Sequence, residues 1–449
     1  MHKLFIWSFP GSISYPPGKF KPVSEIDKAV HGEIPAQTMS MNYSKFSCPS
    51  GYHNELKMKY NFDQYIDRNH TSCVKYDLRQ AVFGKSDVLP MWVADMDFET
   101  PDFIRNAIIQ RAGHPVYGYT FRDKTYFEPI VEWMWSHHAW RIHKTDIIFC
   151  PGVVPALNFA VCAFTKPGEK IIIQPPVYPP FYKAVSDHNR ELVYNQLILE
   201  GNTYLINFDL LEEQARDAVM FILCNPHNPV GRCWNRSELE KILEICLKHN
   251  VLVISDEIHA DLVMPGHSHL VFANLSPEAA QITITAHAPS KTFNLAGLAT
   301  SSVIIQNPEL RSAFSQFIEK MHLGMGNLFG SVASTAAYLN GEPWRLELIS
   351  YLKDNIDFAE AFIREHIPSL KMFRPEATYM IWLDFRKFRL DDDTLKNKLI
   401  QEAGLGFNPG TEFGPGGMGF MRMNIACNRS TLKDALERLQ RVFLSGMHP

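Results

Sequence analysis

Short apolar runs alternate with helical patterns between residues 145 and 305, and this alternation is the strongest constraint on the fold. The strand-like runs are 170–173, 219–224, 251–254, 282–285 and 302–305. Between the second and third runs, apolar residues recur with helical spacing behind Ser237 and Glu240, which we predict to form a capping box. Strands that alternate with helices predict an α/β fold with a mainly parallel sheet, buried on both faces.

Charge and cysteine content exclude several broad classes of protein. The 449 residues include 44 basic and 48 acidic side chains, so the formal net charge is −4. This balance argues against nucleic acid or an anionic membrane as the main partner, and no run approaches the ~18 apolar residues of a membrane span. The eight cysteines form no C-x-x-C pair, a pattern typical of reduced thiols in a cytoplasmic protein.

Residues 1–57 differ in composition from the rest of the chain. They are punctuated by proline and glycine and have little apolar periodicity, a pattern typical of loops and linkers. We expect a loop-like N-terminal extension, with Met58 as the natural start of the chain. The alternative is an ordered arm that packs on the body.

Polar residues follow the ends of neighbouring predicted strands. Asn225 follows one, Asp256 follows the next, and a third strand ends near Thr285. Ligands of open α/β sheets bind beyond the carboxyl ends of the strands, so we expect these residues to meet in one crevice. In the alternative interpretation, Asn225 starts a turn before Pro226 and Asp256 caps the next element.

Lys291 lies in a loop rich in small residues, soon after one of these strands. A lysine that forms a covalent bond with a carbonyl cofactor must sit in a partly desolvated site. Alone, Lys291 is better explained as a solvated loop lysine. Together with Asp256 it favours a pyridoxal site, because a carboxylate there can pair with the pyridinium nitrogen.

With these residues in place, the sequence resembles the pyridoxal 5′-phosphate enzymes of fold type I, the class I/II aminotransferases. Within them it is most similar to the cystathionine β-lyase / C–S lyase subgroup. The resemblance covers about 58–445, and its motifs occur in the family's order. They are Met91–Phe98, Tyr117–Tyr119, Pro175–Tyr182, Asn225–Gly231, Ser255–His259, Ser290–Asn294 and Phe420–Asn424.

The resemblance implies catalytic roles for particular residues. Lys291 is expected to bind the cofactor covalently and then to act as the base at the substrate Cα. Asp256 would pair with the ring nitrogen, Asn225 would hydrogen-bond the phenolic oxygen, and Tyr178 would stack on the ring. Arg422 would bind the substrate α-carboxylate through its planar fork, with an ion-paired surface arginine as the alternative.

The resemblance also implies a phosphate site and a homodimer with shared active sites. Backbone N–H groups of Gly152, Val153 and Val154 would bind the phosphate at the start of a helix. Ser290 could add a hydroxyl. Tyr119, which the resemblance also implies to be catalytic, would reach the phosphate of the neighbouring subunit's cofactor.

Three positions depart from the family's pattern. Ala288 and Ala299 stand where a serine and a phosphate-binding arginine are common, so other donors must serve the phosphate. His259 stands where aminotransferases commonly have tyrosine; it would help to hold the phenolic oxygen or is simply a hydrogen-bonded histidine.

Two other patterns are discounted. Residues 414–419 match G-x-G-x-x-G, but an apparent strand follows them, whereas a dinucleotide site requires a helix. His259, His267 and His269 have no recognisable metal-ligand spacing, so no metal is predicted.

The residues support two reactions equally well. β-Elimination on cystathionine or a related cysteine thioether gives a thiol, pyruvate and ammonia, and the subgroup resemblance favours it. Transamination between an L-amino acid and a 2-keto acid is the first alternative. A protein-contact regulator of a transcription factor, as some proteins that this chain resembles are, is the alternative of another class.

The domain organisation follows from the same resemblance. We expect a large cofactor-binding domain over about 100–345. A smaller domain would combine 58–99 with 346–449, and its strands would include 378–383 and 421–425. The substrate would bind between the domains and the dimer partner.

Overall fold

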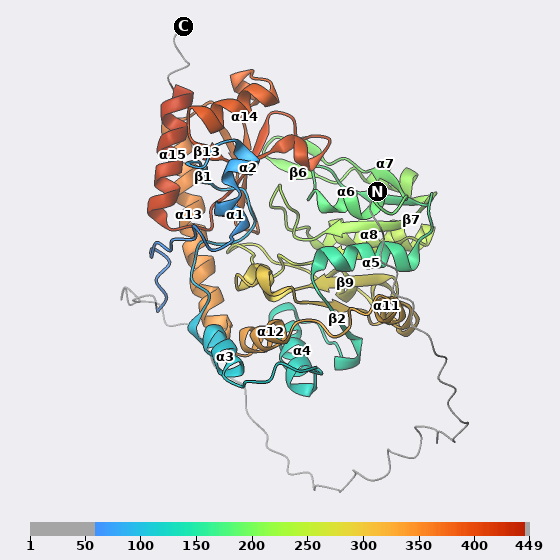
Figure 1. The fold of residues 1–449 in the computed structure, drawn as a ribbon. Coiled ribbons are helices and arrows are strands. Elements are labelled where there is room, and N and C mark those ends of the chain that lie inside the picture. Colours follow the sequence, from blue (N-terminus) through green and yellow to red (C-terminus); the bar gives the residue numbers. More distant parts are fainter. Residues whose placement is uncertain (1–58, 445–449) are drawn as a thin grey trace, which may run out of the picture. The chain divides into compact units, whose positions relative to one another are not determined.

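The computed structural model describes residues 59–444. The extension expected over 1–57 therefore lies outside the described residues. The longer helices are α3 (Asp102–Ala112), α4 (Lys124–His138), α5 (Val153–Phe164), α7 (Phe208–Ala215), α8 (Arg236–His249), α11 (Pro308–Lys320), α12 (Leu328–Asn340), α13 (Glu342–His366), α14 (Asp392–Gln401) and α15 (Arg429–Leu444). Figure 1 shows their arrangement. The shorter helices are α1 (Val74–Asp77), α2 (Arg79–Phe83), α6 (Pro180–Ser186), α9 (Pro277–Gln281) and α10 (Pro289–Thr292).

A seven-stranded sheet forms the centre of the fold. Its order is β2 (Ile147–Cys150), β10 (Ser301–Ile304), β9 (Thr283–His287), β8 (Leu252–Asp256), β7 (Ala218–Cys224), β3 (Lys170–Ile173) and β4 (Glu191–Tyr194). The strands from β9 to β4 pair in parallel, and β10 is antiparallel to both of its neighbours. The α/β prediction and all five predicted strands are confirmed.

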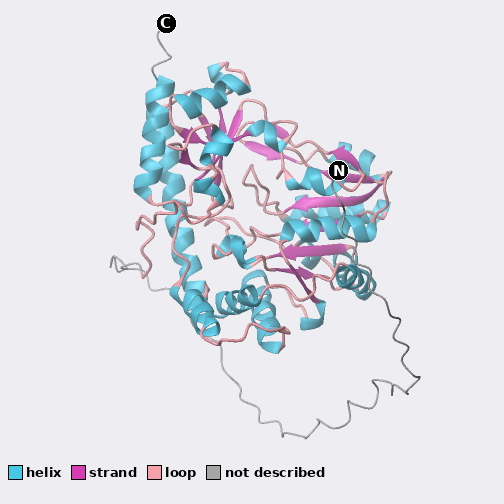
Figure 2. Cartoon of the chain, in the orientation of Figure 1, coloured by secondary structure: helices cyan, strands magenta, loops and turns pink. Residues whose placement is uncertain are grey.

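Helices cover both faces of this sheet (Figure 2). Met220 and Ile222 of β7 belong to one hydrophobic cluster, together with residues of α5, α6 and α11. Phe221 and Leu223 of the same strand belong to another, together with residues of α7 and α8. Successive side chains of a strand point to opposite faces, so a strand covered on both faces is an unbroken apolar run.

Helix α8 begins two residues earlier than the predicted capping box. The cap is Asn235, whose Oδ1 accepts a hydrogen bond from the Glu238 backbone N–H at 3.0 Å. Glu238 Oε2 in turn accepts from the Asn235 N–H at 2.8 Å. The prediction of Ser237 and Glu240 was wrong because Ser237 already lies in the first turn, where its hydroxyl donates to Asn235 Oδ1.

A four-stranded antiparallel sheet lies in the C-terminal part of the chain. Its order is β11 (Lys371–Phe373), β12 (Met380–Asp384), β15 (Phe420–Asn424) and β14 (Asn408–Pro409). This confirms the strands expected at 378–383 and 421–425, and it places 414–419 before a strand. Two-stranded sheets join β1 (Leu89–Pro90) to β13 (Leu405–Gly406), and β5 (Ile198–Glu200) to β6 (Thr203–Leu205). The division into two domains stays a prediction.

Between residues 59 and 444, every helix is either too short or too polar to cross a membrane.

Asn424 ties β15 to the segment that precedes α3. Its Nδ2 donates to the carbonyls of Val93 and Asp95 at 2.7 and 2.6 Å, and its Oδ1 accepts from the Ala426 N–H at 2.8 Å. The side chain is buried, so its loss would leave three backbone groups without their hydrogen-bond partner.

We therefore expect Asn424→Ala to lower the free energy of unfolding by about 2–4 kcal/mol. Urea denaturation followed by tryptophan fluorescence would measure the change. The matched control is Asn397→Ala on the exposed face of α14, which should shift stability by less than ~0.5 kcal/mol. Equal unfolding midpoints for the two variants would contradict the interpretation.

Candidate active site

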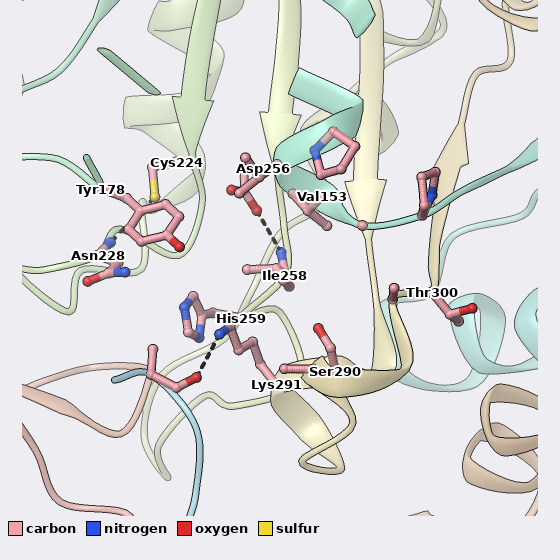
Figure 3. Close-up of a pocket in the computed structure, with 17 residues that line it drawn as sticks. Val153, Tyr178, Cys224, Asn228, Asp256, Ile258, His259, Ser290, Lys291 and Thr300 are labelled. Atoms are coloured by element: carbon pink, nitrogen blue, oxygen red, sulfur yellow. Dashed lines mark hydrogen bonds between the residues drawn. The ribbon is translucent and has the colours of Figure 1, made fainter. Parts of the chain in front are cut away.

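A cavity of about 210 Å³ lies beyond the carboxyl ends of β7 and β8 (Figure 3). Eight of the residues predicted from the sequence line it: Gly152, Val153, Val154, Tyr178, Asp256, His259, Ser290 and Lys291. They come from helices and strands that are far apart in the sequence. Of the three strand ends expected to meet in one crevice, those near Asp256 and before Lys291 contribute predicted residues, whereas Asn225 is not part of the lining.

Lys291 lies on α10, a single turn that follows β9 and the linking Ala288. Its Nζ donates a hydrogen bond to the Ala94 carbonyl at 2.6 Å. Burial and the nearby Arg422 guanidinium together lower the pKa of Lys291 to about 8, although Asp95 and Asp256 act to raise it. A substantial fraction of the amine is therefore neutral, and so nucleophilic, near physiological pH.

Asp256 is the last residue of β8 and is buried. Burial and, to a lesser extent, Glu257 raise the pKa of its carboxyl to about 7, although a hydrogen bond from the Ile258 N–H and the charge on Lys291 oppose the rise. Figure 3 shows the side chains of Asp256 and Lys291 in the same cavity. A cation beside Asp256 would favour the ionised carboxylate.

The residues at the start of α5 line the cavity, and the first N–H groups of a helix have no partner within it. Gly152 caps this helix with a φ of 144°, and a Cβ at that position would meet Pro155 Cδ at 3.2 Å. Thr300 also lines the cavity, and its buried hydroxyl has no hydrogen-bond partner within residues 59–444. A helix N-terminus, the Ser290 hydroxyl and a free hydroxyl form a donor set suited to a phosphate.

Arg422 lies on β15 and is buried next to the cavity. Its guanidinium donates to Asn228 Oδ1 at 3.1 Å and to Asn408 Oδ1 at 2.7 Å. Its Nε is buried and has no partner among the described residues. Burial lowers the pKa of Arg422 to about 10, so it remains a cation at neutral pH.

Asn225, Tyr119 and Arg422 are the predicted residues that do not line this cavity. The Nδ2 of Asn225 donates to the Leu270 carbonyl at 2.9 Å, and its buried Oδ1 has no partner among the described residues. Tyr119 is 98 % exposed and lines a separate hollow near Arg122 and Gly326. Their roles stay predictions.

Nine further residues line the cavity, and sequence reasoning did not name them as site residues; Ala94, Cys224, Asn228 and Thr300 are among them. The first three lie within or next to the motifs given above, so their position in or beside a motif could have identified them as candidates. Thr300 directly follows Ala299, the position at which a phosphate-binding arginine is common in the family. His259 lines the cavity as well, and burial lowers its pKa to about 3, so its ring is neutral.

One cluster has the composition of a metal site. The ligand atoms of His138, Asp261 and His287 lie within 4.8 Å of one another. The carboxylate oxygens of Asp261 already accept hydrogen bonds from Trp133 Nε1 and Thr292 Oγ1, both at 2.9 Å. The hydrogen bonds account for this cluster without an ion. It was not predicted from the sequence, where His259, His267 and His269 were considered as metal ligands and discounted.

With this geometry in hand, the chain can be compared with known proteins. The family model described as aminotransferase class I and II matches residues 86–439, and the chain belongs to this family. It is 45 % identical to cystathionine beta-lyase PatB of Bacillus subtilis (strain 168), over 85 % of this chain and 99 % of that protein. It is 31 % identical to the protein MalY of Escherichia coli (strain K12), over 85 % and 98 %.

The fold matches solved structures of the same kind. Cystalysin from Treponema denticola, whose crystal structure contains pyridoxal 5′-phosphate, aligns with a TM-score of 0.84 and 36 % identity, covering 87 % of this chain and all of that one. The PLP-bound C-S lyase from Staphylococcus hominis aligns with a TM-score of 0.81 and 32 % identity, covering 86 % and 99 %. The fold type I architecture expected from the motifs is confirmed.

The low pKa of Lys291 gives a measurable pH dependence. In the full-length protein without added cofactor, reductive methylation of Lys291 should reach half of its maximal rate near pH 8. Arg422→Met removes a positive charge and should move this midpoint upward, because the protonated amine is then repelled less. Peptide mass spectrometry would follow the labelling, with the exposed Lys241 as the internal control. Identical profiles for Lys291 and Lys241 would refute the assignment.

Proposed function

We propose that this protein is a pyridoxal 5′-phosphate-dependent carbon–sulfur β-lyase that acts on cystathionine or a related cysteine thioether. The observation that carries the proposal is the presence of Lys291 and Asp256 in one cavity of a chain that is 45 % identical to a cystathionine beta-lyase over 85 % of its length. The products would be a thiol, pyruvate and ammonia.

The cavity fits the cofactor in charge and in donor set. Lys291 would bind it covalently, Asp256 would hold the protonated ring nitrogen, and Tyr178 would offer an aromatic face. The start of α5 and the unpartnered Thr300 hydroxyl would bind the phosphate. When bound, pyridoxal phosphate supplies an electron sink for the electron pair left at the substrate Cα.

Lys291 serves as the base of the reaction. A general base works best when its pKa lies near the working pH, and burial places the pKa of this amine at about 8. The Ala94 carbonyl, 2.6 Å from Nζ, orients the amine. Lys291 therefore takes the proton from the substrate Cα.

Arg422 orients the substrate for this step. Asn228 and Asn408 hold its guanidinium, and its unpartnered Nε leaves donor capacity for an α-carboxylate. With the carboxylate fixed, the Cα proton can face Lys291. Breaking the Cβ–S bond then expels the thiolate, and hydrolysis of the remaining unsaturated amino acid gives pyruvate and ammonia.

Transamination is the alternative function, because the chain belongs to an aminotransferase family. This reaction would use the same lysine and the same aspartate. It differs from elimination in needing a 2-keto acid as second substrate, and it leaves the Cβ–S bond intact. The products of a single assay therefore separate the two reactions.

The proposal includes a homodimer with shared active sites, in the cytoplasm. Val116, Tyr117, Tyr119 and Phe121 form an exposed apolar segment, with Tyr119 98 % and Phe121 81 % exposed. An apolar segment of this kind marks an interaction site. A second copy of the chain that covers it would bring Tyr119 to the neighbouring cavity.

The purified protein should release pyruvate and free thiol from L-cystathionine without an added keto acid. Lys291→Ala should lower this activity by more than about 1,000-fold, because the base and the covalent link to the cofactor are lost together. It should also abolish the visible absorbance that forms on adding pyridoxal phosphate. Lys241→Ala, at an exposed position of α8, is the control.

Glutamate formation from 2-oxoglutarate and an amino donor, without thiol release, would instead identify an aminotransferase. Unchanged activity and absorbance in Lys291→Ala would refute the role of that lysine.

Shared active sites can be tested by mixing two inactive variants. Lys291→Ala and Tyr119→Ala should each be impaired alone. In a mixed dimer, one site would combine an intact Lys291 with an intact Tyr119 from the other subunit. Subunit exchange in an equal mixture should therefore restore about a quarter of wild-type activity, as expected for random pairing in a two-fold dimer. No recovery, with exchange verified by mass, would exclude shared sites.

A further inference from the structure

The helix that carries Lys291 is too short to fix the lysine by itself. α10 has four residues, and a single helical turn is not stable on its own. The next residue, Thr292, is fully buried, and its Oγ1 donates a hydrogen bond to Asp261 Oδ2 at 2.9 Å. The position of Lys291 therefore depends on what holds Asp261.

Asp261 is a buried carboxylate that several elements hold at once. Its Oδ1 accepts hydrogen bonds from Trp133 Nε1 and His138 Nε2 of α4, both at 2.9 Å. His287 Nε2, at the end of β9, lies 3.5 Å from Oδ2. Burial acts to raise the pKa of Asp261, but His287 and His138 hold it well below its usual range, so the carboxylate keeps its charge.

The backbone of Asp261 is held as firmly as its side chain. Its carbonyl accepts a hydrogen bond from Arg345 of α13 at 3.0 Å. It lies five residues beyond Asp256, on the segment that leaves β8. The same short segment thus carries the carboxylate of the cavity at one end and the contact to α10 at the other.

We propose that Asp261 is a positioning residue for Lys291, which acts through the Thr292 hydroxyl to fix α10 relative to the end of β8. Asp261 does not line the cavity. Its two oxygens are engaged by α4 on one side and α10 on the other, so it sets the distance between Lys291 and Asp256. This inference rests on the proposed role of Lys291.

Two substitutions of Thr292 separate positioning from packing. Thr292→Val keeps the volume and removes the hydroxyl, so it should lower kcat about 10- to 100-fold, as small misplacements of reacting groups do, with little change in KM. Thr292→Ser keeps the hydroxyl and removes a methyl group, so it should stay within about three-fold of wild type. If Thr292 serves packing alone, the order reverses, because serine leaves a small cavity and valine does not.

A second measurement does not depend on turnover. In full-length protein without added cofactor, the pH midpoint of Lys291 methylation should shift in Thr292→Val and not in Thr292→Ser. The shift follows because a displaced amine changes its distances from Arg422, Asp95 and Asp256, the charges that act on it. Asp261→Asn should shift the midpoint as well, since one amide oxygen replaces two carboxylate acceptors.

The outcomes distinguish this inference from the proposed function. If pyridoxal phosphate and borohydride fail to label Lys291 in the wild-type protein, the proposed function fails. If the wild-type protein is labelled and Thr292→Val matches it in kcat and in the methylation midpoint, Asp261 does not position the lysine. The Thr292 variants keep the inference testable even if Asp261→Asn does not fold.

Discussion

The fold brings an amine and a carboxyl group together where water is largely excluded, and the rest of the site depends on this desolvation. Burial moves the pKa of Lys291 down to about 8 and that of Asp256 up to about 7. Both shifts favour the neutral forms. One ligand could satisfy both buried groups: its cationic ring nitrogen would pair with Asp256, and its electrophilic carbonyl would react with the neutral amine of Lys291.

The surrounding contacts keep these two groups apart and aligned. The Ala94 carbonyl holds the Lys291 amine, and Asn424 anchors the segment that supplies this carbonyl. On the opposite side, Asp261 and Thr292 hold the helix that carries the lysine. Arg422, on the four-stranded sheet, lies close enough for its charge to act on Lys291.

The sequence was most informative where local patterns suffice. Apolar runs placed all five predicted strands of the large sheet, and the polar residues that end them led to Asp256 and to the loop of Lys291. It was less informative where contacts join distant segments. Nothing local in the sequence pairs Thr292 with Asp261, or leaves the Thr300 hydroxyl without a partner. For Asn225, the sequence predicted a contact with the cofactor but gave no sign that its amide N–H donates to the Leu270 carbonyl, 45 residues away.

The lining of the cavity also ties ligand capture to the completeness of the fold. Its residues come from Ala94, the start of α5, the ends of β7 and β8, and α10, which are far apart in the chain. A partly folded chain lacks at least one of these walls. A ligand that needs all of them binds only the finished molecule, and by mass action it stabilises that state alone. The cofactor would then act as a reporter of complete folding as well as a reagent.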